Sequence, residues 1–179
     1  MSGLFAIVGP SGVGKDTLME AAREADPSIV LVRRVITRPS TSGGEDFAGV
    51  TRDEFAGLKG KGAFALDWEA HGLAYGIPAD IQADLAAGHT VLFNGSRAML
   101  ADAAEAFPGM RVIHVTARPD VLSERLRARG RETEDDIRAR LDRAALPLPE
   151  GLDVVEIDNS GRIEDAVTAL LRIVQPVNA

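Results

Sequence analysis

The sequence predicts a three-layer α/β fold built on a five-stranded parallel core sheet. Three observations predict it. Apolar segments of strand length alternate with amphipathic segments along all 179 residues, as in parallel sheets that carry helices on both faces. The first apolar segment runs directly into a glycine-rich loop and then into a helical pattern. No repeat or long linker divides the chain, so we expect a single domain over residues 1–179.

Five apolar segments are the expected strands of the core sheet. They are residues 4–8, 29–36, 90–93, 111–115 and 154–157. Helical patterns follow them at residues 18–25, 78–88, 99–107, 119–129, 133–146 and 161–171. Two helix starts are well marked, because Pro119 suits the first turn of a helix and Thr133 forms a capping-box pattern with Asp136. Residues 38–77 are an insertion between the second and third strands.

The glycine-rich loop has the context and composition of a phosphate-binding loop. It consists of Gly9, Pro10, Ser11, Gly12, Val13, Gly14, Lys15, Asp16 and Thr17. Glycines allow the sharp turn that aims backbone N–H groups inward, and the positive end of the following helix completes an anion cradle. Lys15 supplies a mobile cation for the β- and γ-phosphates of a nucleotide. A glycine-rich turn without a ligand is disfavoured, because strand and helix flank the loop as this motif requires.

The residue after the lysine departs from the usual pattern of this loop. A Ser or Thr hydroxyl that meets Mg²⁺ normally stands there, but this chain has Asp16, and the hydroxyl comes one residue later, at Thr17. Thr17 is therefore the candidate Mg²⁺ ligand. Asp16 has two interpretations that the sequence leaves open. It acts on Mg²⁺ through a water molecule, or it caps the helix N-terminus and has no chemical role.

The composition excludes several classes of partner. The formal net charge of −7 argues against a surface for duplex nucleic acid, and the absence of cysteine excludes disulfides and thiol metal sites. No apolar run is long enough to span a membrane, and no basic segment of the kind found in signal peptides opens the chain. We expect a cytoplasmic protein that binds small molecules; monomer and homodimer both remain open.

The arginines are concentrated at places where a phosphate would bind. Eight of them lie between Arg118 and Arg143, and arginine is the side chain best suited to bidentate phosphate contact. Ligands of parallel sheets lie at the carboxyl ends of the strands, which here are residues 9–10, 34–38, 94–97, 116–118 and 158–159. Small phosphate-loop kinases carry a closing lid where this chain has residues 125–143, and an acceptor site where it has residues 38–77. Solvated Arg–Glu pairs or surface charge account for some of these arginines.

The motifs resemble the guanylate kinase superfamily over nearly the whole chain. Residues 9–17, 37–39, 75–76 and 125–134 carry this likeness. The chain is more closely similar to the ribose 1,5-bisphosphate phosphokinase branch of phosphonate catabolism, on the loop that ends in Lys15 and Asp16 and on residues 34–38, 68–77, 93–97 and 129–132. The resemblance implies a P-loop NTPase fold, ATP and Mg²⁺ as cofactors, and phosphorylation of ribose 1,5-bisphosphate to 5-phosphoribosyl 1-diphosphate.

The same resemblance implies a set of site residues. Lys15, Arg129 and Arg140 are the expected catalytic cations, with Arg129 and Arg140 as the paired arginines of the lid. The nucleotide is expected to contact the glycine-rich loop and Asn159, the latter mostly through its backbone. The expected acceptor-binding residues are Arg34, Arg38, Tyr75, Asn94, Ser96 and Arg97.

Several positions depart from the guanylate kinase pattern. Ile77 stands where a Ser or Thr hydrogen-bonds guanine, and Asn94 stands where the third strand ends in Asp. Residues 40–42 occupy the region of a second arginine. These losses weigh against GMP as acceptor, since a base that keeps unpaired polar edges binds poorly. Guanylate kinase activity, and an inactive interaction module of this fold, are the alternatives; the retained Lys15 and lid arginines weigh against the second.

Overall fold

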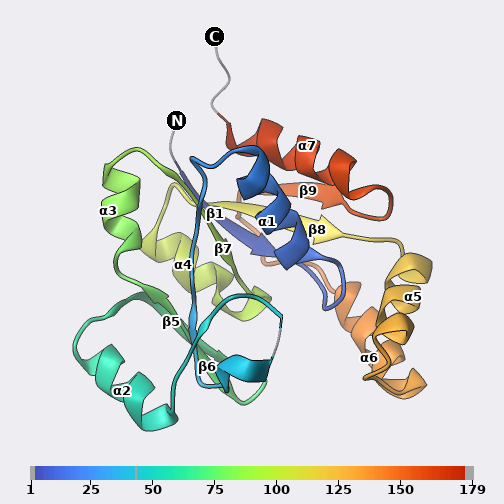
Figure 1. Ribbon diagram of the computed structural model, residues 1–179, viewed down its shortest axis with the longest axis horizontal. Coiled ribbons are helices and arrows are strands. Elements are labelled where there is room, and N and C mark those ends of the chain that lie inside the picture. Colours follow the sequence, from blue (N-terminus) through green and yellow to red (C-terminus); the bar gives the residue numbers. More distant parts are fainter. Residues whose placement is uncertain (1–2, 43, 176–179) are drawn as a thin grey trace.

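The computed structural model describes residues 3–42 and 44–175, which form two sheets with helices around them (Figure 1). The core sheet has five parallel strands in the order β2-β7-β1-β8-β9. Their bounds are β1 Gly3–Val8, β2 Val30–Leu31, β7 Thr90–Asn94, β8 Arg111–Thr116 and β9 Val154–Asp158. The predicted five-stranded parallel sheet is therefore confirmed.

Helices pack on both faces of the core sheet, as the three-layer prediction requires. They are α1 Lys15–Ala25, α3 Ile81–Ala86, α4 Leu100–Ala106, α5 Pro119–Arg129, α6 Glu134–Ala144 and α7 Ile163–Val174, with short 3₁₀ turns η1 Ser40–Ser42 and η2 Arg97–Met99. Side chains of β1 alternate between the two faces. Phe5 and Ile7 join the apolar cluster with α1 and α7, whereas Ala6 and Val8 join the cluster with α4. Within the described residues, no helix has both the length and the apolar composition to cross a membrane.

The insertion, together with residues 35–36 just before it, forms a second, four-stranded sheet with the order β4-β3-β6-β5. Its elements are β3 Val35–Ile36, β4 Ala48–Gly49, α2 Arg52–Gly60, β5 Phe64–Ala70 and β6 Leu73–Pro78. The prediction of one strand over residues 29–36 is wrong, because this segment contributes strands to two different sheets. Residues 30–31 pair with β7 in the core sheet, whereas residues 35–36 pair with β4 and β6 in the small sheet. A single apolar run thus supplies strands to two sheets.

The two faces of the small sheet have different neighbours. On one face α2 packs through Phe55, whose ring stacks on that of Phe64 with centroids 4.7 Å apart. On the other face Leu66, Trp68 and Ile77 join the apolar cluster that also contains β1 and β7 residues. The small sheet therefore packs against the core sheet through the face that carries Trp68.

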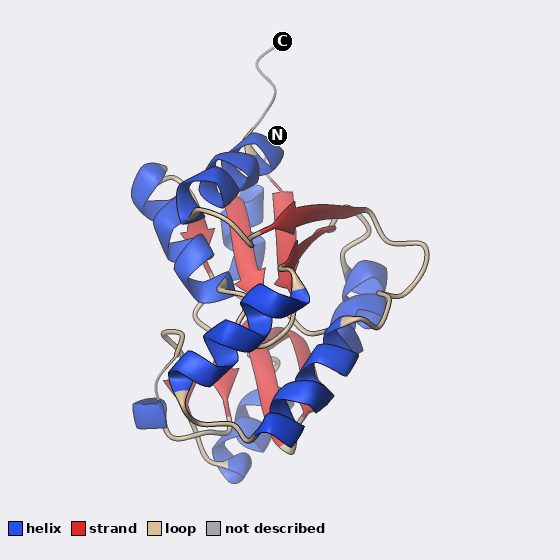
Figure 2. Cartoon of the chain, turned by 90° about the vertical axis from the view of Figure 1, so that its right-hand side faces the viewer, coloured by secondary structure: helices blue, strands red, loops and turns tan. Residues whose placement is uncertain are grey.

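The predicted lid is a helical hairpin made of α5 and α6. Its boundaries differ from residues 125–143, because α5 begins at Pro119, as expected from the proline, and ends before Gly130. Gly130 has a φ of 64°, the left-handed conformation that ends many helices. The capping box between Thr133 and Asp136 at the start of α6 is confirmed. Figure 1 shows α5 and α6 at lower right and the small sheet with α2 at lower left; Figure 2 gives the side view.

Candidate active site

The glycine-rich loop joins β1 to α1 in a conformation that only glycine tolerates. Gly14 has a φ of 93° and precedes the first residue of α1. A Cβ added at Gly9 would lie 2.4 Å from the backbone oxygen of Val115 on the neighbouring strand. The loop therefore needs glycine both for its left-handed turn and for its close packing on β8.

Lys15 opens α1 and folds back over the loop. Its Nζ donates to the backbone oxygen of Gly9 at 2.7 Å and to that of Pro10 at 3.3 Å. Burial, which disfavours the charged form, lowers the pKa of Lys15 from 10.5 to about 8. Among the described residues, two carbonyl groups are the hydrogen-bond partners of this lysine, so an incoming phosphate can replace weak neutral partners with an anionic one.

Charged side chains from three parts of the chain act on Lys15. Beside the dominant effect of burial, the charges of Asp16 and Glu45 raise its pKa, whereas those of Arg34 and Arg129 lower it. Arg34 belongs to the acceptor side and Arg129 to the lid. The charges that act on Lys15 thus include one from the predicted acceptor side and one from the predicted lid.

Asp16, which departs from the usual loop pattern, and Asn94, which departs from the guanylate kinase pattern, contact each other. Asn94, buried at the end of β7, donates from Nδ2 to Oδ1 of Asp16 at 2.9 Å. Asp16 lies in the first turn of α1 but forms no side-chain cap there, since the N-cap is Gly14. The side-chain amide of Asn94, at the end of β7, and the carboxylate of Asp16 therefore form one hydrogen-bonded pair. Thr17, the predicted metal ligand, is exposed on α1.

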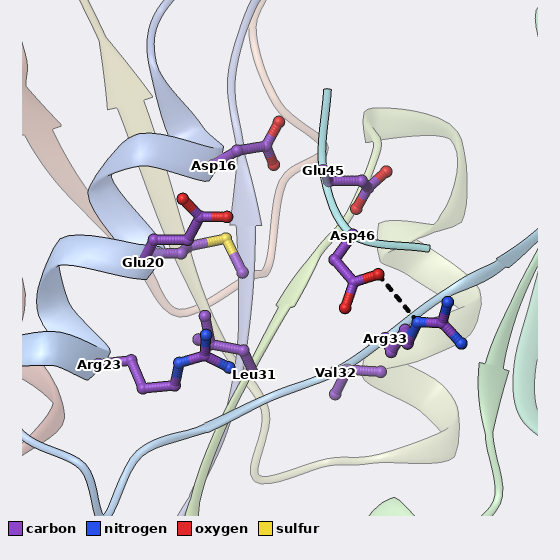
Figure 3. A pocket seen from close by; sticks show the side chains of 9 residues that line it. Asp16, Glu20, Arg23, Leu31, Val32, Arg33, Glu45 and Asp46 are labelled. Carbon is purple, nitrogen blue, oxygen red and sulfur yellow. Dashed lines mark hydrogen bonds and ion pairs between the residues drawn. The ribbon is translucent and has the colours of Figure 1, made fainter. Parts of the chain in front are cut away.

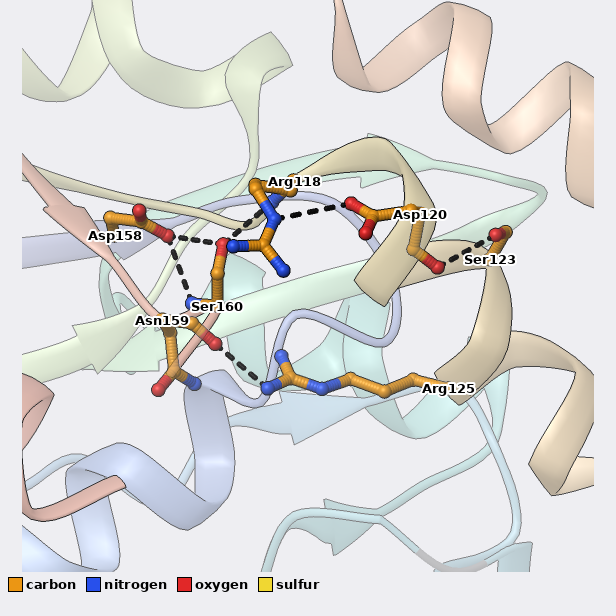
Figure 4. A network of polar contacts seen from close by, with 7 residues as sticks. All are labelled: Arg118, Asp120, Ser123, Arg125, Asp158, Asn159 and Ser160. Carbon is orange, nitrogen blue, oxygen red and sulfur yellow. Dashed lines mark hydrogen bonds and ion pairs between the residues drawn. The ribbon is translucent and has the colours of Figure 1, made fainter. Parts of the chain in front are cut away.

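Asn159 and Arg125 tie the glycine-rich loop to the end of β9 (Figure 4). Asn159 donates from Nδ2 to the backbone oxygen of Val13 at 2.8 Å, and its own backbone oxygen accepts from Nη2 of Arg125 at 2.8 Å. Arg125 also donates from Nη1 to the oxygen of Val13 at 3.3 Å. Asn159 was expected to act through its backbone; its buried side chain contributes as well. Sequence reasoning missed Arg125, which is one of eight arginines in its segment.

The same edge carries a small polar network around Ser160. Its backbone N–H donates to Oδ1 of Asp158 at 2.8 Å, and its hydroxyl accepts from the backbone N–H of Arg118 at 2.7 Å. Hydrogen bonds from Ser160 hold the pKa of Asp158 below its ordinary value. Figure 4 shows how these bonds join the turn after β9 to the start of α5.

Glu132 joins the two predicted lid arginines. Its Oε1 accepts from Nη2 of Arg129 at 3.2 Å and lies 3.3 Å from Nη2 of Arg140. The side chain of Glu132 is only 6% exposed. Arg129 reaches the glycine-rich loop as well, since its Nη2 donates to Oγ of Ser11 at 3.3 Å. Arg129 and Arg140 therefore lie on either side of Glu132, a residue that the sequence did not single out, and their catalytic role stays a prediction.

Arg34 is enclosed on the acceptor side. Its Nε donates to Oε2 of Glu45 at 3.0 Å, and its Nη2 donates to Oε1 of the same carboxylate. The guanidinium carbon lies 4.9 Å from the ring centroid of Tyr75 and 5.9 Å from that of Trp68. Those two rings stack nearly parallel, with centroids 5.3 Å apart. Arg34 and Tyr75, both predicted acceptor residues, are thus neighbours.

Arg33 and Arg38, the other two arginines near the end of this strand, have contacts different from those of Arg34. Arg33 pairs with Asp46 at 3.0 Å, and both side chains are more than half exposed, which fits the surface-charge alternative for this residue. The guanidinium carbon of Arg38 lies 4.3 Å from the ring centroid of Phe47. Only Arg34 and Arg38 therefore remain as acceptor candidates here.

Arg97 makes contacts that the sequence did not predict. Its Nη2 donates to the backbone oxygens of Leu146 at 2.7 Å and Arg143 at 3.4 Å, at the end of α6. Among the described residues, its Nε and the hydroxyl of Ser96 are buried without hydrogen-bond partners. Buried donors without partners are costly, so a ligand that satisfies them would gain affinity. The acceptor-binding role of Ser96 and Arg97 stays a prediction, and Arg97 also contacts the backbone at the end of α6.

A small cavity of about 70 Å³ lies between α1 and the acceptor-side segments (Figure 3). Asp16 and Glu45 lie at one end of it and Arg23 at the other. Four carboxylates and two arginines line it: Asp16, Glu20, Glu45, Asp46, Arg23 and Arg33. Because acids outnumber cations, this cavity does not suit a phosphate. The cations that do suit one gather around Lys15.

The fold and the arrangement around the loop define a phosphate-loop kinase of the guanylate kinase-like type. A solved guanylate kinase from Anaplasma phagocytophilum matches with a TM-score of 0.73, covering 97% of this chain and 84% of that chain at 21% identity. No family model matches the sequence.

Curated relatives narrow this class to a family. Ribose 1,5-bisphosphate phosphokinase PhnN of Agrobacterium fabrum is 47% identical over 175 residues, which cover 96% of each chain. The protein of the same name from a Ruegeria species is 50% identical over 177 residues, covering 98% of this chain and 93% of that one. The chain belongs to the ribose 1,5-bisphosphate phosphokinase family.

Proposed function

We propose that this kinase transfers a phosphoryl group from ATP to ribose 1,5-bisphosphate and forms 5-phosphoribosyl 1-diphosphate. The observation that carries the proposal is that Lys15 and Arg129 both contact the glycine-rich loop, Lys15 at the backbone oxygens of Gly9 and Pro10 and Arg129 at Oγ of Ser11. The charge of Arg34, from the proposed acceptor side, acts on Lys15 as well. Three cations from three segments suit a reaction in which two polyanions meet. The names of the curated relatives support the choice of acceptor.

The proposed division of labour follows the geometry. The amides of the glycine-rich loop and Lys15 would hold the β- and γ-phosphates, while Asn159 would lie on the side of the base. The lid hairpin closes with Arg129 and Arg140 over the phosphates and excludes water. The nucleophile is an oxygen of the 1-phosphate, which is already anionic near pH 7, so no general base is required. Positioning and charge neutralisation are then the main contributions of the protein.

Mg²⁺ fits the donor set beside the loop. The Oδ2 atom of Asp16 makes no hydrogen bond to the described residues, and Thr17 adds an exposed hydroxyl. Carboxylate, hydroxyl and water oxygens are the ligands that Mg²⁺ prefers. Asp16 and Thr17 would hold the ion, with Asn94 fixing the orientation of Asp16. When bound, Mg²⁺ neutralises charge on the β- and γ-phosphate oxygens.

The acceptor side favours a sugar over a nucleobase. Ile77 has no exposed surface and belongs to the apolar cluster, so it offers no hydrogen bond to a base. Ser96 and Arg97 present buried donors instead, which suit the hydroxyl and phosphate oxygens of a pentose bisphosphate. Arg34, Arg38 and Tyr75 would hold one of its phosphates.

ATP consumption with each of two acceptors tests the proposed function. We expect Mg²⁺-dependent turnover with ribose 1,5-bisphosphate and a kcat/KM for GMP at least about 10²-fold lower, because the polar edges of guanine would be left unpaired. Turnover should be followed by a coupled ADP assay and by chromatography of the product. Turnover with GMP alone would replace the proposal with guanylate kinase activity, and no turnover with either would favour a non-catalytic module.

The Asp16–Asn94 pair predicts a changed response to Mg²⁺. Asp16→Asn should raise the Mg²⁺ concentration for half-maximal activity roughly tenfold, since a neutral amide attracts a cation-bound water less strongly than a carboxylate does. Mg²⁺-dependent tightening of ATP binding, measured by calorimetry, should weaken in parallel. Glu20→Gln, also on α1 and at the same cavity, is the matched control. An unchanged Mg²⁺ dependence in Asp16→Asn would rule out a role for Asp16 in metal binding.

A further inference from the structure

We propose that Glu45 is a positioning residue for the acceptor: it clamps one edge of Arg34 so that the other edge faces an acceptor phosphate. The inference rests on the proposed function, which leaves Glu45 without a role. In this proposal, Glu45 determines how tightly the enzyme binds its phosphorylated acceptor.

The clamp is defined by which donors of Arg34 it uses. A guanidinium carries five N–H donors in a planar fork, and a carboxylate can engage two of them along one edge. Glu45 takes the edge formed by Nε and Nη2. Among residues 3–42 and 44–175, no hydrogen bond engages Nη1 of Arg34. The edge formed by Nη1 and Nη2 therefore keeps donors for a second anion, and Glu45 does not have to leave.

The aromatic rings fix the plane of the same guanidinium. Tyr75 and Trp68 lie within 6 Å of its carbon, a distance at which a cation is attracted to an aromatic face. The side chains of Arg34 and Glu45 are only 9% and 13% exposed. Arg34 is thus held at its edge by a carboxylate and at its face by rings, which leaves one direction for a ligand. Such preorganisation lowers the entropy cost of binding.

The clamp lies near the glycine-rich loop. Asp16 of the loop and Glu45 line the same end of one cavity (Figure 3), and the charges of Arg34 and Glu45 both act on Lys15. A lone Arg34 beside Lys15 would suffer repulsion between two cations in a poorly solvated site. Glu45 offsets that repulsion, so that Arg34 keeps its place while Lys15 remains charged.

The neighbouring pair offers a matched control. Arg33 and Asp46 follow the same segments one residue away, but their side chains are 59% and 79% exposed. Exposed ion pairs of this kind contribute little to folding stability. Glu45→Gln and Asp46→Asn remove the same charge from adjacent positions, and only the first releases an enclosed arginine.

The experiment compares KM and kcat of these variants, with ribose 1,5-bisphosphate and with ATP. For Glu45→Gln we expect KM for the acceptor to rise about tenfold or more, as for the loss of a charge-assisted hydrogen bond, while KM for ATP stays within about twofold. Asp46→Asn should resemble wild type. Arg34→Lys should reproduce the rise, and the double variant should add little, because both changes break one clamp. Thermal unfolding identifies variants that fail to fold, for which Glu45→Asp serves as the substitute.

Each outcome decides the inference. A lower acceptor KM in Glu45→Gln would mean that Glu45 competes with the acceptor for Arg34, and an unchanged KM would mean that the clamp does not serve binding; both overturn the proposal. If wild-type protein uses GMP alone, the proposed function fails while the same ratios, measured with GMP, still decide the role of Glu45.

Discussion

Lys15→Ala is expected to lower kcat by roughly 10²–10³-fold or more, as when a fixed donor to transition-state charge is removed. Lys15 is the cation of the glycine-rich loop, and within the part of the chain that the structure describes its Nζ donates to the backbone oxygens of Gly9 and Pro10. Transition-state charge spreads over the oxygens of the transferred phosphoryl group, where this ammonium would lie. Single-turnover kinetics with ribose 1,5-bisphosphate measure the loss at the chemical step.

Lys59 provides the control for net charge. Lys59→Ala removes the same charge from α2, where the side chain is 60% exposed and pairs with Asp67. It should leave kcat within about twofold of wild type, since surface substitutions of this kind have small effects. Near-wild-type activity in Lys15→Ala would refute the assignment of the phosphate-binding loop.

The lowered pKa of Lys15 gives a second readout of the same prediction. Its folded value of about 8 lies below the ordinary 10.5, so between these pH values the unfolded chain binds more protons. The contribution of Lys15 to folding stability is therefore least favourable below about pH 8, and it rises as the pH increases through this window. A bound triphosphate favours the charged form, so ATP binding near pH 8.5 should take up protons. Calorimetry in buffers of different ionisation enthalpy measures this uptake, which Lys15→Ala should abolish.

The glycine-rich loop and the core sheet could be predicted because their signals are local. The pattern of residues 9–17 requires a strand before it and a helix after it, and both are found. The division of residues 29–36 between two sheets has no such signal. Val32 still donates its backbone N–H to Leu92 of the core sheet, while the oxygen of Arg34 already accepts from Ala48 in the small sheet. Apolar character shows that a segment is buried, but not which sheet it joins.

The contacts that complete the site were beyond reach of the sequence for a related reason. Arg125 bonds to Val13 across 112 residues, and Arg97 bonds to Leu146 across 49. Tertiary packing decides which arginine of a dense segment makes such a contact, because the local sequence around these arginines does not distinguish them. Glu45 and Glu132 are acids whose importance comes from the arginines they meet, which only the folded chain reveals.

Arg129→Ala is the second substitution for which we expect a large loss, of roughly 10²–10³-fold in kcat. Arg129 is the lid residue that touches both the glycine-rich loop, at Ser11, and the bridging carboxylate of Glu132. In the proposed reaction, its guanidinium would neutralise charge on the transferred group, as arginines supplied to phosphoryl transfer do. The loss should appear in kcat more than in KM for ATP, because this contact strengthens in the transition state.

Arg127→Ala is the control that distinguishes an effect of the position of Arg129 from an effect of its charge. It lies two residues earlier on α5, where it pairs with Glu134 on the exposed surface. Arg127→Ala removes the same charge and should stay within about twofold of wild type. Glu132→Gln should show an intermediate loss with an unchanged melting temperature, since it frees Arg129 and Arg140 without removing them. If Arg127→Ala and Arg129→Ala lose activity equally, the effect belongs to the charge of the lid as a whole, and the specific role of Arg129 is wrong.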